Sequence, residues 1–516
     1  MSRSIITSGC PCCRLARWPA GMGVYQTTAP NSGETPSFSN QTATEPSVYA
    51  LAGDDNTHDL FESVEPGRWL VIQGGTVIPM TRELRQPHHD VLIRDGRIEA
   101  VQPTGDALPA GAKVLSARDK YVVPGLSEIH GHPLLAHHVE LYAPALAPDK
   151  KLHEFVLPYD LQLFLYLAAG VTRLEILAGS AEELELREAV RTGRIRGPLI
   201  RVASPMIDGF PAMFPPSVSW VAGDIEGARL AAREIKRQGF DFAKPYTRLS
   251  PEVFRALLDE CSRLDIPVMG HIPENVGADA ALEMGQSGVA HVFEFFYHDS
   301  PDKRHDVDRM RHYAKLARQH NVTVQTTICA AKLLEHDFVT GVDPNARQFL
   351  EPMMKFMLND QDTYTRLFRS DPQISDLYRG IGAASVLMTQ ALVAEGVALL
   401  VGTDMPGSNV TQGHTVHEEL RICVEEVGMR PVEALRSATV LAAEYHGESA
   451  KAGQISPGQR SDVVILNRDP TVSIRATTSI DTVIVGRSVL TSEARARGIA
   501  RAIERYEAMP VPRASS

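Results

Sequence analysis

The side chains with the most chemistry to offer are four histidines, one lysine and one aspartate, and each stands where a short apolar run ends. They are His130, His132, Lys244, His271, His291 and Asp404. His130 and His132 are two residues apart, so both imidazoles point to the same side of an extended strand and can reach one ion. Polar groups at the ends of apolar runs are costly to bury without partners. The pattern therefore favours one shared site, with a metal ion bound by the histidine pair.

The runs that carry these residues alternate with helical stretches, which indicates a barrel of parallel strands. Eight runs are rich in β-forming residues: VVPGLSEIHGH, GVTRLEILAG, PLIRVASPM, FDFAKPY, IPVMGHI, GVAHVFEF, VTVQTTI and VALLVGTDMP. Strands separated by helices need crossover connections, and eight such units close into an α/β fold, the (β/α)8 TIM barrel. An open doubly wound sheet is the alternative, but no glycine-rich phosphate turn follows the first strand. In a barrel, the strand ends that carry the polar residues meet at one mouth.

The rest of the chain divides around this barrel. Residues 1–56 are rich in Ser, Thr, Pro and Asn without periodicity, and we expect a disordered extension there. Short strand runs in 68–120, read as an antiparallel unit, and in 446–492 predict a small β-sandwich domain built from both ends of the chain. The barrel then covers 121–445, and a C-terminal helix and tail cover 493–516.

Two insertions interrupt the alternation of strands and helices. Ile207–Trp220 follows the third strand, and residues 330–380 follow the seventh. Loops after barrel strands lie at the active-site face, so both predict pocket walls or lids, with surface decoration or an oligomer contact as the other interpretation. The first loop carries candidates for an aromatic wall that fits a bulky apolar substrate group: Phe210, Met213, Phe214 and Trp220.

Composition and charge narrow the class of partner. The 516 residues are 43% hydrophobic, and 52 basic against 63 acidic residues give a net charge of −11. This balance argues against nucleic acid and against an anionic membrane surface, and it favours a small-molecule substrate. No apolar run reaches the roughly 20 residues of a membrane span. The six cysteines form no disulfide framework, so we expect a cytoplasmic protein, and a homo-oligomer is compatible with the sequence.

The order of the motifs matches a known family. VVPGLSEIHGH, GFDFAKPY, PVMGHIPENV, GVAHVFEF, VGTDMPG and GQISPGQRSDVVILNRDP follow one another along Trp69–Leu490. Over this range the chain resembles the amidohydrolase superfamily of metal-dependent hydrolases, and within it the prolidase-like and imidazolonepropionase-like branch. The set of motifs is specific for the superfamily and much less specific for the substrate.

The resemblance implies a centre with two divalent metal ions, expected to be Zn²⁺. The ligands would be His130, His132 and Asp404 for the more buried ion, His271 and His291 for the second, and Lys244 as the bridge. Lys244 would be carboxylated by CO2, because an ammonium cannot bind a cation whereas a carbamate offers two oxygens.

The resemblance also implies a reaction. A hydroxide shared by the two ions would attack an amide carbonyl, and Asp404 would be the catalytic residue that accepts its proton and passes it to the leaving amine. The substrate would be a small molecule with an amide C–N bond: a dipeptide, an N-acyl amino acid or an amide-bearing xenobiotic. No arginine is obviously placed to clamp a substrate carboxylate, which argues against strict dipeptidase specificity.

Weaker candidates surround the metal ligands. Tyr246, two residues beyond Lys244 on the same strand face, His137 in the loop after the first strand, and Phe214 are the predicted substrate contacts. His137 and its neighbour His138 could instead be solvated residues of a loop. Tyr246 could instead serve only in packing.

Three further residues have a structural interpretation beside the functional one. Glu175 in the second run could bind metal, as a glutamate does in some relatives, but a salt bridge inside the barrel rim is favoured because Lys244 is present. His414 and His417 follow the strand that carries Asp404, and they either line the pocket or pack at a helix N-terminus.

Two other functions stay open from the sequence. A mononuclear deaminase or cyclic-amide hydrolase of the same superfamily is the first, because Glu274 follows His271 by three residues and deaminases keep a glutamate acid–base there. A catalytically silent barrel that acts as a binding protein is the second, although such proteins usually lose metal-binding residues and this chain keeps the full set.

Overall fold

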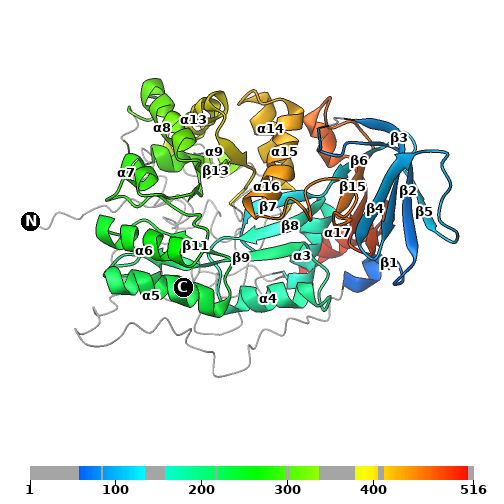
Figure 1. Ribbon diagram of the computed structural model, residues 1–516, viewed down its shortest axis with the longest axis horizontal. Helices are drawn as coiled ribbons and strands as arrows, with labels where there is room; N and C mark the ends of the chain where they lie inside the picture. The colour runs from blue at the N-terminus through cyan, green and yellow to red at the C-terminus, as the bar shows by residue number, and fades with distance from the viewer. Residues whose placement is uncertain are drawn as a thin grey trace, which may run out of the picture.

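The computed structural model describes residues 57–82, 85–133, 157–214, 218–297, 299, 302–335, 378–404 and 412–509. The described residues form a mixed α/β structure with a large sheet at one side and a ring of parallel strands with helices at the other (Figure 1). Among these residues, every helix is too short or too polar to cross a lipid bilayer. The predicted segments 1–56 and most of 330–380 lie outside the described residues.

The large sheet joins the two ends of the described chain. Its nine strands are β1 (Glu62–Ser63), β2 (Trp69–Val77), β3 (Gln86–Arg94), β4 (Arg97–Pro103), β5 (Lys113–Ser116), β6 (Tyr121–Pro124), β15 (Val463–Leu466), β16 (Ile480–Val485) and β17 (Ser488–Leu490). β15 pairs antiparallel with β6, and one apolar cluster contains Ile72 of β2, Ile465 of β15 and Ile484 of β16. Segments far apart in sequence therefore share one core, seen as blue and orange strands side by side in Figure 1.

Local chemistry explains part of this sheet. Asp95 and Gly96 both have positive φ (50° and 77°), which suits the tight turn between β3 and β4. β5 and β6 run parallel to β2, so the sheet is mixed and the expectation of a purely antiparallel unit was wrong. Parallel neighbours need longer connections than a hairpin turn, and the alternation of apolar and polar residues along a strand does not show which kind of neighbour it will have.

The predicted first barrel strand, 122–132, is two strands. β6 belongs to the large sheet and β7 (Leu126–Gly131) belongs to the barrel, with Gly125 between them. A side chain on Gly125 would lie 2.1 Å from Oγ1 of Thr172, so only glycine fits where the chain passes from one sheet to the other.

The barrel closes around eight parallel segments of the described chain. β7, β8 (Val171–Ile176), β9 (Leu199–Asp208) and β11 (Phe242–Pro245) form one ladder, and β12 (Gly288–Val289), β13 (Thr323–Gln325) and β14 (Ala398–Leu400) form another. The stretch 268–270 bridges β11 and β12 through the pairs Ala243–Val268 and Gly270–Val289. The circuit returns to β7 where Ile129 N–H donates to Val401 O (3.4 Å) and Asp404 N–H donates to His130 O (2.7 Å). The predicted (β/α)8 fold is confirmed.

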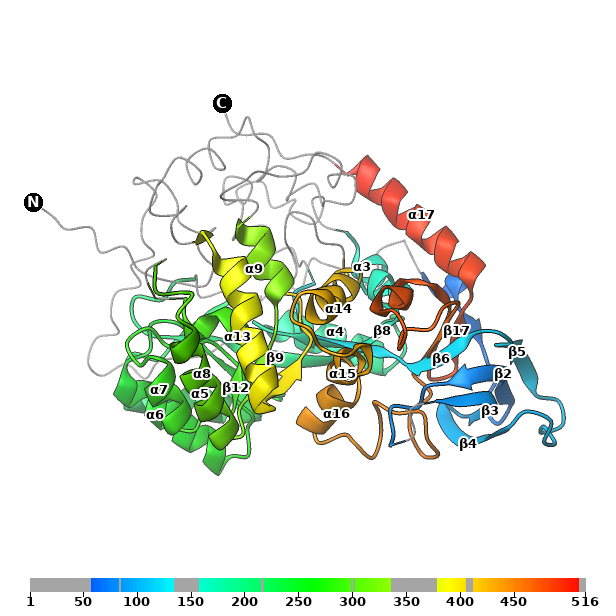
Figure 2. The same cartoon turned by 90° about the horizontal axis from the view of Figure 1, so that it is seen from above.

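Helices cover the outside of the barrel. They are α3 (Tyr159–Ala168), α4 (Ala181–Arg191), α5 (Ile225–Gln238), α6 (Pro251–Arg263), α7 (Ala278–Glu283), α8 (Val307–Gln319), α9 (Ile328–Glu335), α13 (Ile381–Glu395), α14 (Thr415–Glu425), α15 (Pro431–Ser437) and α16 (Val440–Tyr445). α5 is typical, because Asp224 caps its first turn and Gly239 ends it in the left-handed conformation. A last helix, α17 (Ser492–Ala508), lies outside the barrel, where Arg495 donates to Ala168 O at the end of α3 (Figure 2).

The barrel interior is filled with side chains below its mouth. Leu177, Ala203, Phe242, Met269 and Ala290, from five successive parallel segments, form one buried cluster with Tyr445 packed against it. A packed interior leaves the carboxyl ends of the strands as the place where polar side chains can converge.

Candidate metal centre

The six sequence-predicted residues lie together at the mouth of the barrel. His130 ends β7, Lys244 lies in β11, and His271, His291 and Asp404 follow the next parallel segments, with His132 just past β7. Neighbouring rings are in contact: the centroid distances are 5.2 Å for His130–His132, 4.5 Å for His130–His291 and 4.9 Å for His271–His291. Five of the six are buried, and His132 is half-buried.

Asp404 is the hub of this cluster. Its Oδ1 lies 3.2 Å from Nε2 of His130 and 3.2 Å from Nε2 of His132, and its Oδ2 lies 3.9 Å from Nδ1 of His291. The ligand atoms of His130, His132 and Asp404 all lie within 4.8 Å of one another, so one metal ion could be held by all three. Asp404 has a φ of +57°, a left-handed conformation that non-glycine residues rarely adopt and that is often found at functional sites.

The electrostatics of the cluster prepare it for a cation. Burial lowers the pKa of His130 to about 4 and holds the pKa of His291 well below its usual value, so both imidazoles are neutral at pH 7 and keep a lone pair for a metal. Burial opposes ionisation of Asp404, but the nearby His130 and His291 outweigh it and hold the pKa of this carboxyl well below its usual range. The three groups therefore combine neutral donors with one negative charge.

Gln325 of β13 fixes the orientation of His130. Nε2 of Gln325 donates to Ile129 O (2.8 Å), so its Oε1 must be the acceptor that lies 2.8 Å from Nδ1 of His130. Nδ1 of His130 then carries the proton, and Nε2, which faces Asp404, carries the lone pair. A partner of this kind on the second ring nitrogen is typical of metal-binding histidines.

The two histidines of the predicted second metal site, His271 and His291, also have polar partners. Oγ1 of Thr327 lies 3.1 Å from Nδ1 of His291, and Oε1 of Glu294 lies 3.1 Å from Nδ1 of His271. Oε2 of Glu294 also accepts the backbone N–H of Ile272 (2.8 Å), so the carboxylate is itself held in place. Carboxylate and hydroxyl partners of this kind orient imidazoles for metal binding.

Glu128 ties together the two strands that carry the first three predicted ligands. Its Oε1 accepts the backbone N–H groups of His130 (2.9 Å) and Thr403 (3.0 Å), and its Oε2 accepts the Thr403 hydroxyl (2.6 Å). Burial raises the pKa of Glu128 to about 8. The Glu128 side chain therefore fixes the backbone on both sides of the His130–Asp404 contact.

Lys244 enters the cluster as a buried amine. Its side chain is 2% exposed, its backbone N–H donates to Ser204 Oγ (3.1 Å), and its charge contributes to lowering the pKa of both His130 and His291. An ammonium at this place competes with a metal cation for the same negative charge. The two can share the site only if the lysine loses its positive charge.

An aromatic side extends from the cluster. The ring of Tyr246 lies 4.4 Å from that of His271, and Phe214 lies edge-on to Tyr246 at 5.8 Å. Phe210, on the same loop as Phe214, keeps 48% of its surface exposed. Trp220, the fourth residue of the predicted wall, is buried and packs edge-on against Phe240 with ring centroids 5.9 Å apart.

Asp208 holds the loop that carries Phe210 and Phe214. Its Oδ1 accepts the backbone N–H groups of Gly209 (2.9 Å) and Arg248 (2.7 Å), and its Oδ2 accepts that of Met213 (2.9 Å). The carboxylate therefore joins the end of β9 to the end of β11.

The weaker candidates fall outside the cluster. Glu175 pairs with His446 at 2.9 Å, which is the salt bridge that was favoured for it, although at the lower end of the barrel. His417 uses both ring nitrogens in packing contacts, 3.0 Å from Thr477 Oγ1 and 3.0 Å from Ala169 O. Glu274 is exposed on a loop. His137 and His138 lie outside the described residues.

Sequence reasoning missed the residues that orient the ligands. Gln325, Glu294 and Thr327 stand near the ends of predicted strands but give no motif of their own. Glu128 carried a usable signal, because it precedes His130 by two residues and so repeats the same-face spacing of the histidine pair. A carboxylate two residues before such a pair is worth testing as a partner rather than a ligand.

A barrel with a His–His–Asp group at its mouth is typical of metal-dependent enzymes. The comparison with known families identifies which family this chain belongs to. The amidohydrolase family matches residues 219–489, more than half of the chain. The chain belongs to the amidohydrolase family.

Solved structures share the fold at low sequence identity. The bottromycin amidohydrolase AH superposes with a TM-score of 0.68 at 23% identity, covering 90% of this chain and 98% of that one. A Xaa-Pro dipeptidase with bound methionine gives a TM-score of 0.62 at 18% identity (82% and 100% covered), and ochratoxinase of A. niger gives 0.61 at 18% (83% and 97%). At these identities the likeness concerns the fold alone.

Curated relatives match shorter parts of the sequence. Imidazolonepropionase of Geobacillus kaustophilus (strain HTA426) is 37% identical over 92 residues, which are 17% of this chain and 21% of the relative. Adenine deaminase 3 of Rhizobium meliloti (strain 1021) is 21% identical over 409 residues, 78% of this chain and 54% of the relative. The chain thus matches about a fifth of the length of the first relative and about half of the second, so neither activity transfers directly.

Proposed function

We propose that this chain is a metal-dependent amidohydrolase that hydrolyses the amide C–N bond of a small molecule. The observation that carries the proposal is the convergence of His130, His132 and Asp404, whose ligand atoms lie within 4.8 Å of one another inside a family of metal-dependent enzymes. Imidazole and carboxylate donors in this arrangement fit a divalent cation of the zinc type.

The residues divide into two proposed ligand sets. His130, His132 and Asp404 would hold one ion, and His271 and His291 the other. When bound, two such ions would supply a hydroxide at neutral pH and polarise the scissile carbonyl.

Asp404 is also the proposed proton carrier. It is buried, ionised and central among the histidines, so it can accept a proton during attack on the carbonyl and deliver it to the departing amine.

Lys244 is the proposed bridge between the two ions, as a carbamate. The ammonium first loses a proton; the resulting amine then joins CO2, forming one N–C bond as one C–O π bond of CO2 opens and a second proton leaves. With two protons released, the charge at this position changes from +1 to −1. Lys244 lies close enough to His130 and His291 for its charge to act on both, so an ammonium there would repel a metal cation. The change of charge removes this repulsion.

The substrate is proposed to carry a bulky apolar group next to its amide bond. Phe214 and Tyr246 continue the line of rings away from His271, and Phe210 presents an exposed ring on the same anchored loop. An N-acyl amino acid, a dipeptide or an aryl amide with an aromatic or branched side chain would cover this apolar surface.

A hydrolysis screen tests the proposal. Zinc-loaded protein is assayed on dipeptides, N-acyl amino acids, aryl amides and lactones, and bound metal is measured by elemental analysis. We expect amide hydrolysis with two ions per chain, and loss of both the second ion and most of the activity in Lys244→Ala. The matched control is His312→Ala, which removes a histidine paired with Asp279 on the surface of α8 and should leave activity and metal content unchanged.

The same measurements separate the alternative functions. One ion per chain, with activity that survives Lys244→Ala, would support a mononuclear deaminase or cyclic-amide hydrolase, an alternative that the similarity to adenine deaminase keeps in view. If His130→Ala binds metal and turns over substrate as well as wild type, the assignment of this centre to the reaction fails. If the zinc-loaded wild type turns over none of the substrates, a role as a binding protein would take the place of the enzyme.

A further inference from the structure

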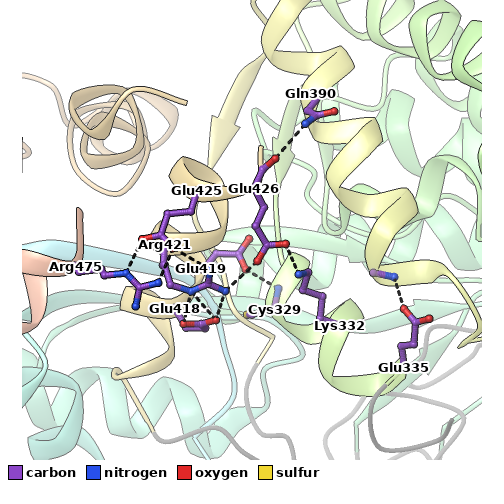
Figure 3. Close-up of polar contacts among 11 residues, drawn as sticks. Cys329, Lys332, Glu335, Gln390, Glu418, Glu419, Arg421, Glu425, Glu426 and Arg475 are labelled. Carbon is purple, nitrogen blue, oxygen red and sulfur yellow. Dashed lines mark hydrogen bonds and ion pairs between the residues drawn. The ribbon is translucent and has the colours of Figure 1, made fainter. Parts of the chain in front are cut away.

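One buried carboxylate behind the metal centre has no part in the roles assigned above. Glu419 lies on α14 and is 0% exposed. Its Oε1 accepts the backbone N–H of Ile328 (2.9 Å) and its Oε2 accepts that of Cys329 (2.7 Å). Figure 3 shows Glu419 reaching from α14 towards Cys329 at the start of α9. A carboxylate is expensive to bury, so its retention here calls for a function beyond filling space.

The two N–H groups belong to the corner where β13 turns into α9. Thr327 stands directly before them, is fully buried and has a φ of +43°. A β-branched residue in this left-handed region is strained, and such a conformation persists only where its surroundings enforce it. The hydrogen bonds from Ile328 and Cys329 to Glu419 fix the backbone directly after Thr327, and the N–H of Thr326 donates to Leu400 O directly before it (3.0 Å). The strained residue is also the one whose Oγ1 lies 3.1 Å from Nδ1 of His291.

A second buried carboxylate performs the corresponding task for the first three predicted ligands. Glu128 binds the backbone N–H groups of His130 and Thr403, just as Glu419 binds those of the β13–α9 corner. The two carboxylates are neighbours: after burial, the charge of Glu419 is one of the causes that raise the pKa of Glu128. Cys329 joins the two corners, because its Sγ donates to Thr403 O at 3.6 Å.

We propose that Glu419 is a positioning residue for the second metal site. Its paired hydrogen bonds hold the β13–α9 corner so that Thr327 presents its hydroxyl to His291, and through His291 the carboxylate sets the affinity for the second ion. The inference rests on the proposed binuclear function. Glu128 and Glu419 thus divide the centre into two separately supported halves.

The competing explanation is that Glu419 only fastens α14 to α9. The structure supplies a matched control for this, because a second glutamate of the α14 end joins the same two helices. Glu426 forms an ion pair with Lys332 of α9 at the surface, and both pairs are visible in Figure 3. If fastening the helices were the whole role, loss of either glutamate would have the same kind of effect.

The experiment compares Glu419→Gln with Glu426→Gln. Gln at 419 offers one acceptor oxygen and turns an NH2 group towards the second N–H, so one of the two hydrogen bonds is lost. Zn²⁺ is titrated into the metal-free, full-length proteins by calorimetry against a competing chelator. We expect Glu419→Gln to weaken the second ion about 10- to 100-fold, the range for residues that orient metal ligands, with the first ion unchanged. Glu426→Gln should keep both affinities.

A second pair of variants guards against a folding defect at Glu419. Thr327→Val removes the hydroxyl but keeps the shape of the side chain, and Thr327→Ser keeps the hydroxyl. We expect the valine variant to lose affinity for the second ion and the serine variant to retain it. If Glu419→Gln and Thr327→Val bind both ions as tightly as wild type, whatever their melting temperatures, the positioning role is wrong.

A metal-free readout separates this inference from the proposed function. In apo protein with ¹⁵N-labelled histidine, the Nδ1 and Nε2 signals of His291, assigned with His291→Asn, report its tautomer. We expect Glu419→Gln to shift the His291 signals and leave those of His130 unchanged. Should wild type bind a single ion, the binuclear function fails while this measurement still decides the positioning role; unchanged His291 signals would overturn it.

Discussion

The two ends of the barrel both bury polar side chains, but they do so with different partners. At the mouth, four histidines and Asp404 face one another beside Lys244. At the lower end, a cluster that we call the floor cluster joins Arg173 to Glu448 at 3.0 Å, Arg201 to Glu448 at 3.7 Å and His446 to Glu175 at 2.9 Å. The void beside it measures about 10 Å³ and holds no more than one water molecule.

The difference shows why burial alone does not mark a functional site. In the floor cluster, the side chains pair with one another: Glu448 lies between Arg173 and Arg201, and Glu175 faces His446. At the mouth, the ligand atoms of His130, His132 and Asp404 lie within 4.8 Å of one another, a spacing that suits one metal cation. Glu175 lies in the same barrel as the candidate metal-binding group, but it pairs with His446 at 2.9 Å.

The largest effect is expected from removing a predicted metal ligand at the mouth of the barrel. His130→Ala removes one of three convergent donors, so we expect loss of at least one tightly bound Zn²⁺ and a fall in kcat/KM of about 10³-fold or more, or about 4 kcal/mol. Elemental analysis and hydrolysis kinetics measure both. The circular dichroism spectrum should stay that of the wild type; a variant with full metal content would contradict the assignment of the mouth.

The next largest effect is expected from a substitution that disrupts the floor cluster and leaves the residues at the mouth unchanged. Glu448→Gln removes the carboxylate shared by Arg173 and Arg201, and Arg173 is buried, so we expect a loss of about 2 kcal/mol in the free energy of unfolding. Urea unfolding measures it. Metal content and kcat should match wild type within error, and a selective loss of metal would show that the two clusters are not independent.

A smaller effect tests orientation at the mouth. Gln325→Leu keeps the size of the side chain but removes the acceptor for Nδ1 of His130. We expect affinity for the first ion to fall about 10- to 100-fold, with stability lowered by about 1 kcal/mol through the lost hydrogen bonds. Competition with a zinc chelator provides the measurement; Gln325→Glu, which keeps an acceptor, should lose less.

The smallest effect concerns the aromatic side. Phe210→Ala removes an exposed ring, so we expect unchanged metal content and a fall in kcat/KM of about five-fold, about 1 kcal/mol, for substrates with a bulky apolar group. Substrates with a small side chain should lose nothing. An equal loss on both kinds of substrate would rule out a role for Phe210 in recognition.

Much of the candidate metal centre could be predicted from sequence because its residues stand at the ends of strands. His130, Lys244, His271, His291 and Asp404 each follow a recognisable apolar run, and barrel topology brings such ends together whatever the details of packing. The residues that orient them were not predictable in this way. Gln325 and Glu419 act across 195 and 90 residues of sequence, on His130 and on Cys329, and no local pattern records such a pairing.

The sequence by itself determined the fold class and the donors of the candidate metal centre, because strand–helix alternation and the types of residue at strand ends are local properties. Only the tertiary structure decided how those donors are held and which buried polar residues pair with one another elsewhere in the barrel. Glu175 and Asp404 look alike as acids at barrel strands, and their roles diverge because one meets His446 and the other meets His130 and His132. The reason is that the cost of burying a charge depends on the partners that folding brings to it.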